Sequence, residues 1–168
     1  PSTPVLKPRS LYETRGDSWT LNTHYRKIEL AAPNEGSTPL NPANGLSTVF
    51  GLDKNGDNVV DALYAGDRYG NVWKIDVSST DPANWGSAFS SGSTPLPLFT
   101  ATTADSPAVM QQITTSPVVM PNPNGGYLVF FGTGSFVDES DNASPFSMNS
   151  FYGVWDKDDG TRVNRPGN

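Results

Sequence analysis

The chain has 168 residues, the length of a single domain, and it is rich in Gly (16) and Pro (15), while Asp outnumbers Glu by 13 to 4. This composition favours turns and short strands and excludes a helical bundle. The net charge of −6, with basic residues scattered along the chain, argues against a nucleic-acid partner. No apolar run reaches the length of a membrane-spanning helix, and the absence of Cys excludes disulfides and thiolate chemistry. Because the sequence begins at Pro1 and not at Met, we interpret it as a mature or excised piece of a longer protein.

Residues 1–46 are predicted to form an irregular N-terminal segment with strands of an incomplete structural unit, because prolines interrupt every helix that could form there. Leu21–Leu30 is a candidate strand in this segment. After Gly45 the sequence divides into short apolar runs bounded by Gly, Asp, Asn or Pro, which predict strands. The first four predicted strands are Ser47–Gly51, Ala62–Gly66, Asn71–Val77 and Pro95–Thr100, and the next four are Ile113–Met120, Tyr127–Gly132, Ser150–Asp156 and Thr161–Asn164.

The second group of four runs repeats the first in order and in residue pattern. Val72–Asp76 (VWKID) corresponds to Tyr152–Asp156 (YGVWD), and Leu63–Gly66 corresponds to Phe130–Gly132. Four short antiparallel strands repeated along a chain are typical of β-propeller blades, which bury their faces only against neighbouring blades. We therefore predict an all-β fold, a partial or modified β-propeller with two four-stranded antiparallel blades in residues 47–168. A β-sandwich of two four-stranded sheets stays open as the alternative.

The acidic stretch Asp53–Asp61, of sequence DKNGDNVVD, carries the most specific chemical signal in the chain. Counted from Asp53 as position 1, side-chain oxygens fall at positions 1, 3, 5 and 9, and a backbone carbonyl is available at position 7. A tightly curled loop turns alternate positions inward, and Ca²⁺ binds about six to eight oxygens in loops of this spacing. The predicted metal ligands are Asp53, Asn55, Asp57, the carbonyl of Val59, and Asp61.

The loop departs from a helix-flanked EF-hand. Position 12 is Tyr64 instead of a bidentate Glu, position 6 is Asn58 instead of Gly, and strands are predicted on both sides. Asn tolerates the left-handed backbone conformation, so the turn can still form, and water or both oxygens of Asp61 would fill the places left by the Glu. Mg²⁺ is the weaker candidate because it demands stricter octahedral geometry. An Asx-rich turn without a metal is the remaining alternative.

Five blocks of sequence occur in order along residues 44–156. They are Asn44–Ser47, Asp53–Asp61, Leu63–Asp76, Phe131–Phe136 and Ser150–Asp156. In these residues the chain resembles the C-terminal β-propeller domain of type IV pilus biogenesis and tip-associated factors of the PilY/PilC family. The resemblance implies a modified β-propeller that takes Ca²⁺ at the matching loop positions. Residues 1–43 carry no part of it.

The resemblance also implies a function. It points to a non-enzymatic domain that regulates pilus extension and retraction, and hence twitching motility, and that contributes to surface adhesion. The implied partners are pilins, minor pilins or pilus assembly components, and the implied location is the bacterial cell surface, at the pilus tip or the outer membrane and periplasm. Two alternatives stay open: a quinoprotein-like propeller enzyme, suggested by the strand pair from Ala65 to Trp73, and a passive extracellular module stapled by calcium.

Other motifs give weaker signals. Arg15, Gly16 and Asp17 spell a tripeptide that integrins recognise, which would add host surface receptors as partners, although a solvated turn also explains it. His24 is expected in a partly buried strand position, with no residues available to build a catalytic set around it. Acidic residues in 138–141 are expected in a solvated inter-strand loop, and those in 156–159 in a hairpin turn without a bound ligand. The strand aromatics are expected mainly in the core between blades: Tyr64, Trp73, Phe130, Phe131, Phe151, Tyr152 and Trp155.

Overall fold

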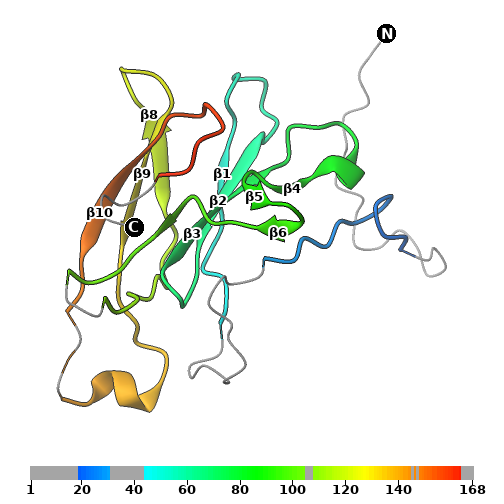
Figure 1. Ribbon diagram of the computed structural model, residues 1–168. Helices are drawn as coiled ribbons and strands as arrows, with labels where there is room; N and C mark the ends of the chain where they lie inside the picture. Colours follow the sequence, from blue (N-terminus) through cyan, green and yellow to red (C-terminus); the bar gives the residue numbers. More distant parts are fainter. Residues whose placement is uncertain (1–18, 31–43, 105–107, 145, 147, 164–168) are drawn as a thin grey trace, which may run out of the picture.

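A computed structural model of the chain describes residues 19–30, 44–104, 108–144, 146 and 148–163. Its sheets are antiparallel, and its only helices within these ranges are two short 3-10 helices, η1 (Pro82–Asn84) and η2 (Glu139–Asn142) (Figure 1). No α-helix is found in the described part of the chain. The predicted all-β class is therefore confirmed.

The first sheet contains β1 (Phe50–Leu52), β2 (Ala62–Gly66), β3 (Asn71–Asp76) and β4 (Gly86–Ser87) in that order, with β7 (Phe99–Thr100) also paired to β3. β4 and β7 together occupy the position of a fourth strand beside β3. β4 pairs with one end of β3 at Ile75 and Asp76, whereas β7 pairs with the other end at Asn71 and Val72. The sheet thus has the width of one propeller blade.

The run Pro95–Thr100, predicted as one strand, is divided between two sheets. Thr94–Pro95 (β6) pairs with Ser90–Ser91 (β5) in a separate two-stranded hairpin, and Phe99–Thr100 pairs with β3. Pro97 lies between the two pieces and has no N–H to donate to a strand ladder. The prediction of a single strand failed because this proline interrupts the pairing.

The second sheet has three strands, in the order β10 (Phe151–Asp156), β9 (Tyr127–Gly132) and β8 (Val118–Pro121). The prediction of a further strand at Thr161–Asn164 is wrong for residues 161–163, and Asn164 lies outside the described residues. Positive φ angles at Asp158 (55°) and Gly160 (81°) turn the chain away from β10. The N–H of Val163 then donates to the carbonyl of Leu98 at 3.1 Å instead of continuing the second sheet.

The prediction of a strand at Leu21–Leu30 is also wrong. This segment contains only an isolated bridge between Leu21 and Tyr25, formed around a turn in which Asn22 has a φ of 65°. The N–H groups of Thr23 and His24 both donate to the carbonyl of Thr20. The backbone hydrogen bonds here close a local turn and are not available to a neighbouring strand.

The turn from β2 to β3 is organised by Asp67, whose side chain has no exposed surface. One carboxylate oxygen accepts the backbone N–H groups of Tyr69 and Asn71, both at 2.9 Å. The other accepts three side-chain N–H groups, from Trp73 at 2.8 Å, Asn71 at 3.0 Å and Asn44 at 3.2 Å. One buried carboxyl side chain, which accepts five hydrogen bonds, therefore fixes the geometry of the Leu63–Asp76 sequence block.

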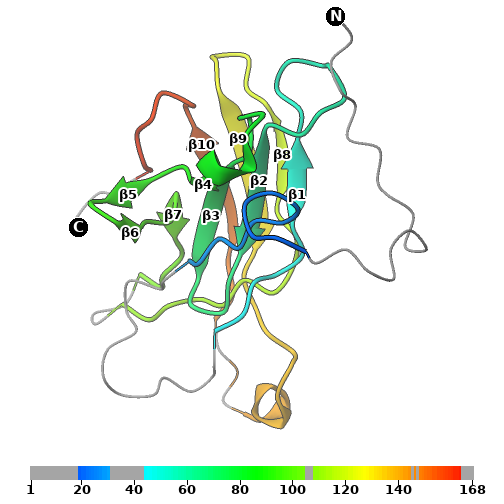
Figure 2. The same ribbon diagram turned by 90° about the vertical axis from the view of Figure 1, so that its right-hand side faces the viewer.

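The two main sheets stack face to face, and their facing side chains form one core (Figures 1 and 2). The core side chains of the strands are Leu52, Ala62, Tyr64, Val72, Phe99, Val119, Val129, Phe131 and Val154. Phe151 and Trp155, in contrast, are 75% and 39% exposed, so their predicted place in the core is wrong. Because side chains alternate along a strand, these two lie opposite to Val154 and face away from the first sheet.

Candidate metal centre

The acidic loop Asp53–Asp61 joins β1 to β2, as the sequence predicts (Figure 1). The two strands stay in register up to the loop, with Leu52 opposite Ala62. Across the base of the loop, the N–H of Asp61 donates to the carbonyl of Leu52 at 2.9 Å. Residues 54–60 are exposed. The loop is thus an exposed hairpin connection whose two ends are fixed by the sheet.

Asp53 organises the first half of the loop. One of its carboxylate oxygens accepts the N–H groups of Asn55 at 3.2 Å and Gly56 at 2.7 Å, and the other accepts the N–H of Asn58 at 2.8 Å. Partial burial opposes the charge on Asp53, but these N–H groups outweigh it and hold the pKa of its carboxyl below the usual 3.8. The first predicted ligand is therefore an ionised carboxylate around which the chain curls.

The next predicted ligands continue this pattern. The side-chain oxygen of Asn55 accepts the N–H of Asp57 at 2.9 Å, and Asp57 in turn accepts the N–H of Val59 at 2.8 Å. Such bonds from a side chain to the N–H two residues ahead are Asx turns. Asp61 accepts the N–H of Lys54 at 2.8 Å and closes the loop on itself. All four predicted side-chain ligands thus hold the curl of the backbone.

Two residues of the loop adopt the left-handed backbone conformation. Gly56 has a φ of 78° and Asn58 a φ of 67°. The sequence predicts this conformation for Asn58, which stands in place of the Gly of an EF-hand, and the structure confirms it. The tight reversal that a calcium loop requires is therefore present without a glycine at position 6.

The donor set fits a hard divalent cation in chemistry, because it consists of three carboxylates, one carboxamide and one carbonyl within nine residues. The curled backbone fits as well. The structure does not, however, bring the carboxylates of Asp53, Asp57 and Asp61 to a common point. In the described part of the chain, no group of three or more His, Cys, Asp or Glu side chains converges closely enough to hold a metal ion. The carboxylates of the loop instead accept the N–H groups of its backbone.

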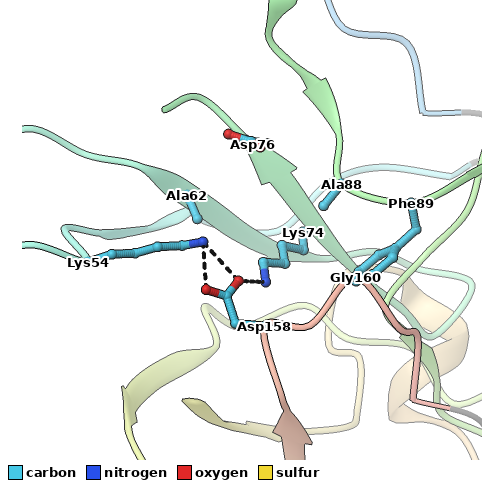
Figure 3. Close-up of a pocket in the computed structure, with 8 residues that line it drawn as sticks. All are labelled: Lys54, Ala62, Lys74, Asp76, Ala88, Phe89, Asp158 and Gly160. Carbon is cyan, nitrogen blue, oxygen red and sulfur yellow. Dashed lines mark hydrogen bonds and ion pairs between the residues drawn. The ribbon is translucent and has the colours of Figure 1, made fainter. Parts of the chain in front are cut away.

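A second group of ionisable side chains lies at the junction of the two sheets and was missed by the sequence analysis. Lys74 of β3 is buried, and its ammonium lies 2.7 Å from Asp156. The same ammonium lies 2.6 Å from Asp158 (Figure 3). Asp156 has no exposed surface and also accepts the hydroxyl of Tyr64 at 2.8 Å. Burial, together with the negative charge of Asp156, raises the pKa of Tyr64 above its usual value.

The sequence contained one signal for this group. Lys74 stands inside an otherwise apolar strand, where a buried ammonium requires a carboxylate partner. The assignment of Asp156 to a hairpin turn was wrong, because it is the last residue of β10 and its buried carboxylate is that partner. Asp158 keeps 31% of its side chain exposed and does lie in a turn.

The remaining predicted features fall at the edges of the fold. Asp141 in η2 accepts the hydroxyl of Ser135 and the N–H groups of Val137 and Asp138, which accounts for this acidic stretch as a capped turn. His24 is exposed, so its predicted partial burial is wrong, and its ring accepts the N–H of Thr20 at 2.9 Å. The tripeptide at residues 15–17 lies outside the described residues.

Stacked antiparallel sheets are expected both of neighbouring β-propeller blades and of a β-sandwich, and the comparison with known families decides for a β-propeller domain. The family described as the PilY1 beta-propeller domain matches residues 22–166. The chain belongs to this family, which confirms the resemblance found in the sequence.

Curated relatives agree with this assignment. A type IV pilus biogenesis factor PilY1 homolog of Xylella fastidiosa is 38% identical over 135 residues, which cover 78% of this chain and 9% of the relative. PilY1 of Pseudomonas aeruginosa strain PAO1 is 38% identical over 128 residues, which cover 68% of this chain and 11% of the relative. The chain thus spans about a tenth of the length of these relatives.

The fold is similar to the crystal structure of the Pseudomonas aeruginosa PilY1 C-terminal domain, with a TM-score of 0.65 and 31% sequence identity. The match covers 80% of this chain and 29% of the solved chain. The described residues contain no helix with the length and apolar character needed to cross a bilayer.

Proposed function

We propose that this chain is a calcium-binding, non-enzymatic propeller domain of a type IV pilus biogenesis factor, and that the bound cation regulates whether the pilus extends or retracts. The observation that carries the proposal is the curled Asp53–Asp61 loop, in which Asx turns and two left-handed residues bend the backbone around side chains that carry oxygen donors. Family membership supplies the pilus context.

The proposed ligands are Asp53, Asn55, Asp57, the carbonyl of Val59, and Asp61. A bound Ca²⁺ supplies two positive charges that offset the repulsion among the three carboxylates. On binding, the side-chain oxygens would exchange part of their bonds to loop N–H groups for the cation. Because the ends of the loop are fixed by β1 and β2, this exchange acts on the loop and leaves the blade itself in place, unlike the opening of a helix pair.

The loop is exposed, so its conformation is available for a partner to recognise. We propose that this partner is a pilin, a minor pilin or another component of pilus assembly, at the bacterial cell surface or in the periplasm. A contribution to surface adhesion is part of the same proposal.

The experiment compares pilus number and twitching in cells whose full-length protein carries Asp61→Ala, with Asp159→Ala as the matched control. Asp159 is exposed, and in the described part of the chain its side chain accepts hydrogen bonds from the backbone N–H and the hydroxyl of Thr161. We expect Asp61→Ala to abolish the dependence of piliation on calcium and Asp159→Ala to preserve it. Unchanged calcium-dependent piliation in Asp61→Ala cells, with the protein folded and present, would overturn the regulatory role and favour a passive calcium staple.

A further inference from the structure

Lys54, the second residue of the acidic loop, contacts both the loop and the second sheet. Its backbone N–H donates to Asp61 at 2.8 Å. Its ammonium lies 2.8 and 3.0 Å from the two carboxylate oxygens of Asp158, which is 104 residues away in the sequence (Figure 3). One residue therefore connects the last acidic residue of the loop to the turn that follows β10.

Asp158 is itself held in the turn that follows β10. Its N–H donates to Asp156 at 2.9 Å, and its carboxylate also accepts the buried ammonium of Lys74 at 2.6 Å. Its φ of 55° is a left-handed conformation, which costs energy in a residue other than glycine and persists where surrounding contacts enforce it. Partial burial works against its charge, but the hydrogen bonds from Lys54 and Lys74 keep the pKa of Asp158 below its usual value.

The pair also determines where the positive charge beside the loop lies. Both carboxylate oxygens of Asp158 lie within hydrogen-bond distance of the Lys54 ammonium. In Figure 3 the side chain of Lys54 extends to Asp158 and meets it on the side opposite to Lys74. The ammonium of Lys54, the only cationic side chain within the acidic loop, is thus held by the turn that follows β10 and is not free to pair with the loop carboxylates.

We propose that the Lys54–Asp158 ion pair couples the calcium loop to the second sheet, so that calcium binding and ordering of the Asp156–Gly160 turn strengthen one another. The inference rests on the proposed calcium site. A coupling of this kind is reciprocal: whatever the turn contributes to calcium affinity, calcium contributes equally to the ordering of the turn. Lys54 acts as a positioning residue, because its side chain restrains the loop and is not a ligand.

The test uses the sign of the effect of Lys54→Met on calcium affinity, measured by calorimetry. Loss of an ammonium near three carboxylates would, by Coulomb's law alone, tighten calcium binding. Loss of the coupling predicts the opposite, about fivefold weaker binding or more. Lys157→Met also removes one positive charge, beside Asp158 in the turn after β10, but the ammonium of Lys157 lies over the ring of Trp155, 5.4 Å from the centroid. We expect its calcium affinity to match the wild type or to be slightly higher.

A second pair of variants checks the other partner. Asp158→Asn should weaken calcium binding, whereas Asp159→Asn, which removes the same charge one residue along, should have a smaller effect. Hydrogen exchange then reports the reciprocal effect: calcium should slow exchange of the amides of residues 157–160 in the wild type, and in Lys54→Met the protection should stop at the loop.

The outcomes separate the two proposals. Absence of calcium binding to the wild-type chain overturns the proposed function, and the coupling with it. Calcium binding to the wild type that is equalled or exceeded by Lys54→Met overturns the coupling alone. Protection of residues 157–160 that persists in Lys54→Met also overturns the coupling and leaves the calcium site intact.

Discussion

Asp67→Asn tests whether a single buried carboxylate holds the central hairpin of the first sheet. In either orientation, the carboxamide of the new Asn would direct an NH₂ group toward N–H donors, because both oxygens of Asp67 act only as acceptors. With the NH₂ group at one position, the backbone N–H groups of Tyr69 and Asn71 lose their acceptor. With it at the other, the side-chain donors of Trp73 and Asn71 lose theirs and cannot adapt, because the Trp73 ring is completely buried and the Asn71 carboxamide oxygen already accepts the hydroxyl of Thr100 at 2.8 Å. Either orientation therefore leaves two buried donors without an acceptor.

The expected magnitude follows from these two donors. A buried donor left without an acceptor costs about 1–3 kcal/mol, so Asp67→Asn should lower the free energy of unfolding by about 2–6 kcal/mol. Domains of this size are stable by about 5–15 kcal/mol, so the loss is a large part of the total. Urea unfolding followed by tryptophan fluorescence measures it, with exposed Asp159→Asn as the control for the change of charge. A loss below about 1 kcal/mol, no greater than that of the control, would refute the reasoning.

Three further predictions concern other parts of the fold. Gly126→Ala should lower the free energy of unfolding in urea by about 2 kcal/mol or more, because φ is +68° and a Cβ would lie 2.2 Å from the carbonyl oxygen of Asp156. Gly125→Ala, with φ +89° and open space around the new Cβ, should lower it by only about 1 kcal/mol, and equal losses would contradict this. Tyr64→Phe should cost about 1–2 kcal/mol in the same assay, through the lost hydrogen bond to Asp156, and a neutral result would count against that bond. The N–H groups around Asp141 hold its pKa at about 2, below the usual 3.8. The stabilisation of the 137–141 turn by Asp141 is therefore complete above pH 3.8 and is lost as the pH falls toward 2. Amide hydrogen exchange in this turn should accelerate over that pH range in the wild type but not in Asp141→Asn.

The local features of the fold could be predicted from the sequence because they depend on neighbouring residues. The spacing of Asp53, Asn55 and Asp57 fixes a series of Asx turns whatever the rest of the chain does. In the same way, the short apolar runs bounded by turn residues correctly predict β2, β3 and β9. The repeat of the strand pattern points to a β-propeller, and the match to the propeller family confirms that fold.

The errors arose where residues distant in sequence decide the outcome. Alternation along β10 shows that Val154 and Trp155 face opposite sides, but it does not show which side meets the first sheet. The partner of Lys54 could not be identified either, because Asp158 is brought to it only by the stacking of the two sheets. Strand propensity also cannot decide whether Val163 adds a strand to the second sheet or, as the structure shows, donates its N–H to Leu98.

The central claim is that the Asp53–Asp61 loop binds Ca²⁺, and calorimetric titration of Ca²⁺ into chelator-stripped protein tests it most directly. We expect one saturable site, weaker binding of Mg²⁺ as a competitor, and strongly reduced calcium affinity in Asp57→Asn, whose side chain keeps an oxygen for the N–H of Val59. A wild-type titration without a saturable signal, or one that Asp57→Asn reproduces unchanged, would contradict the account.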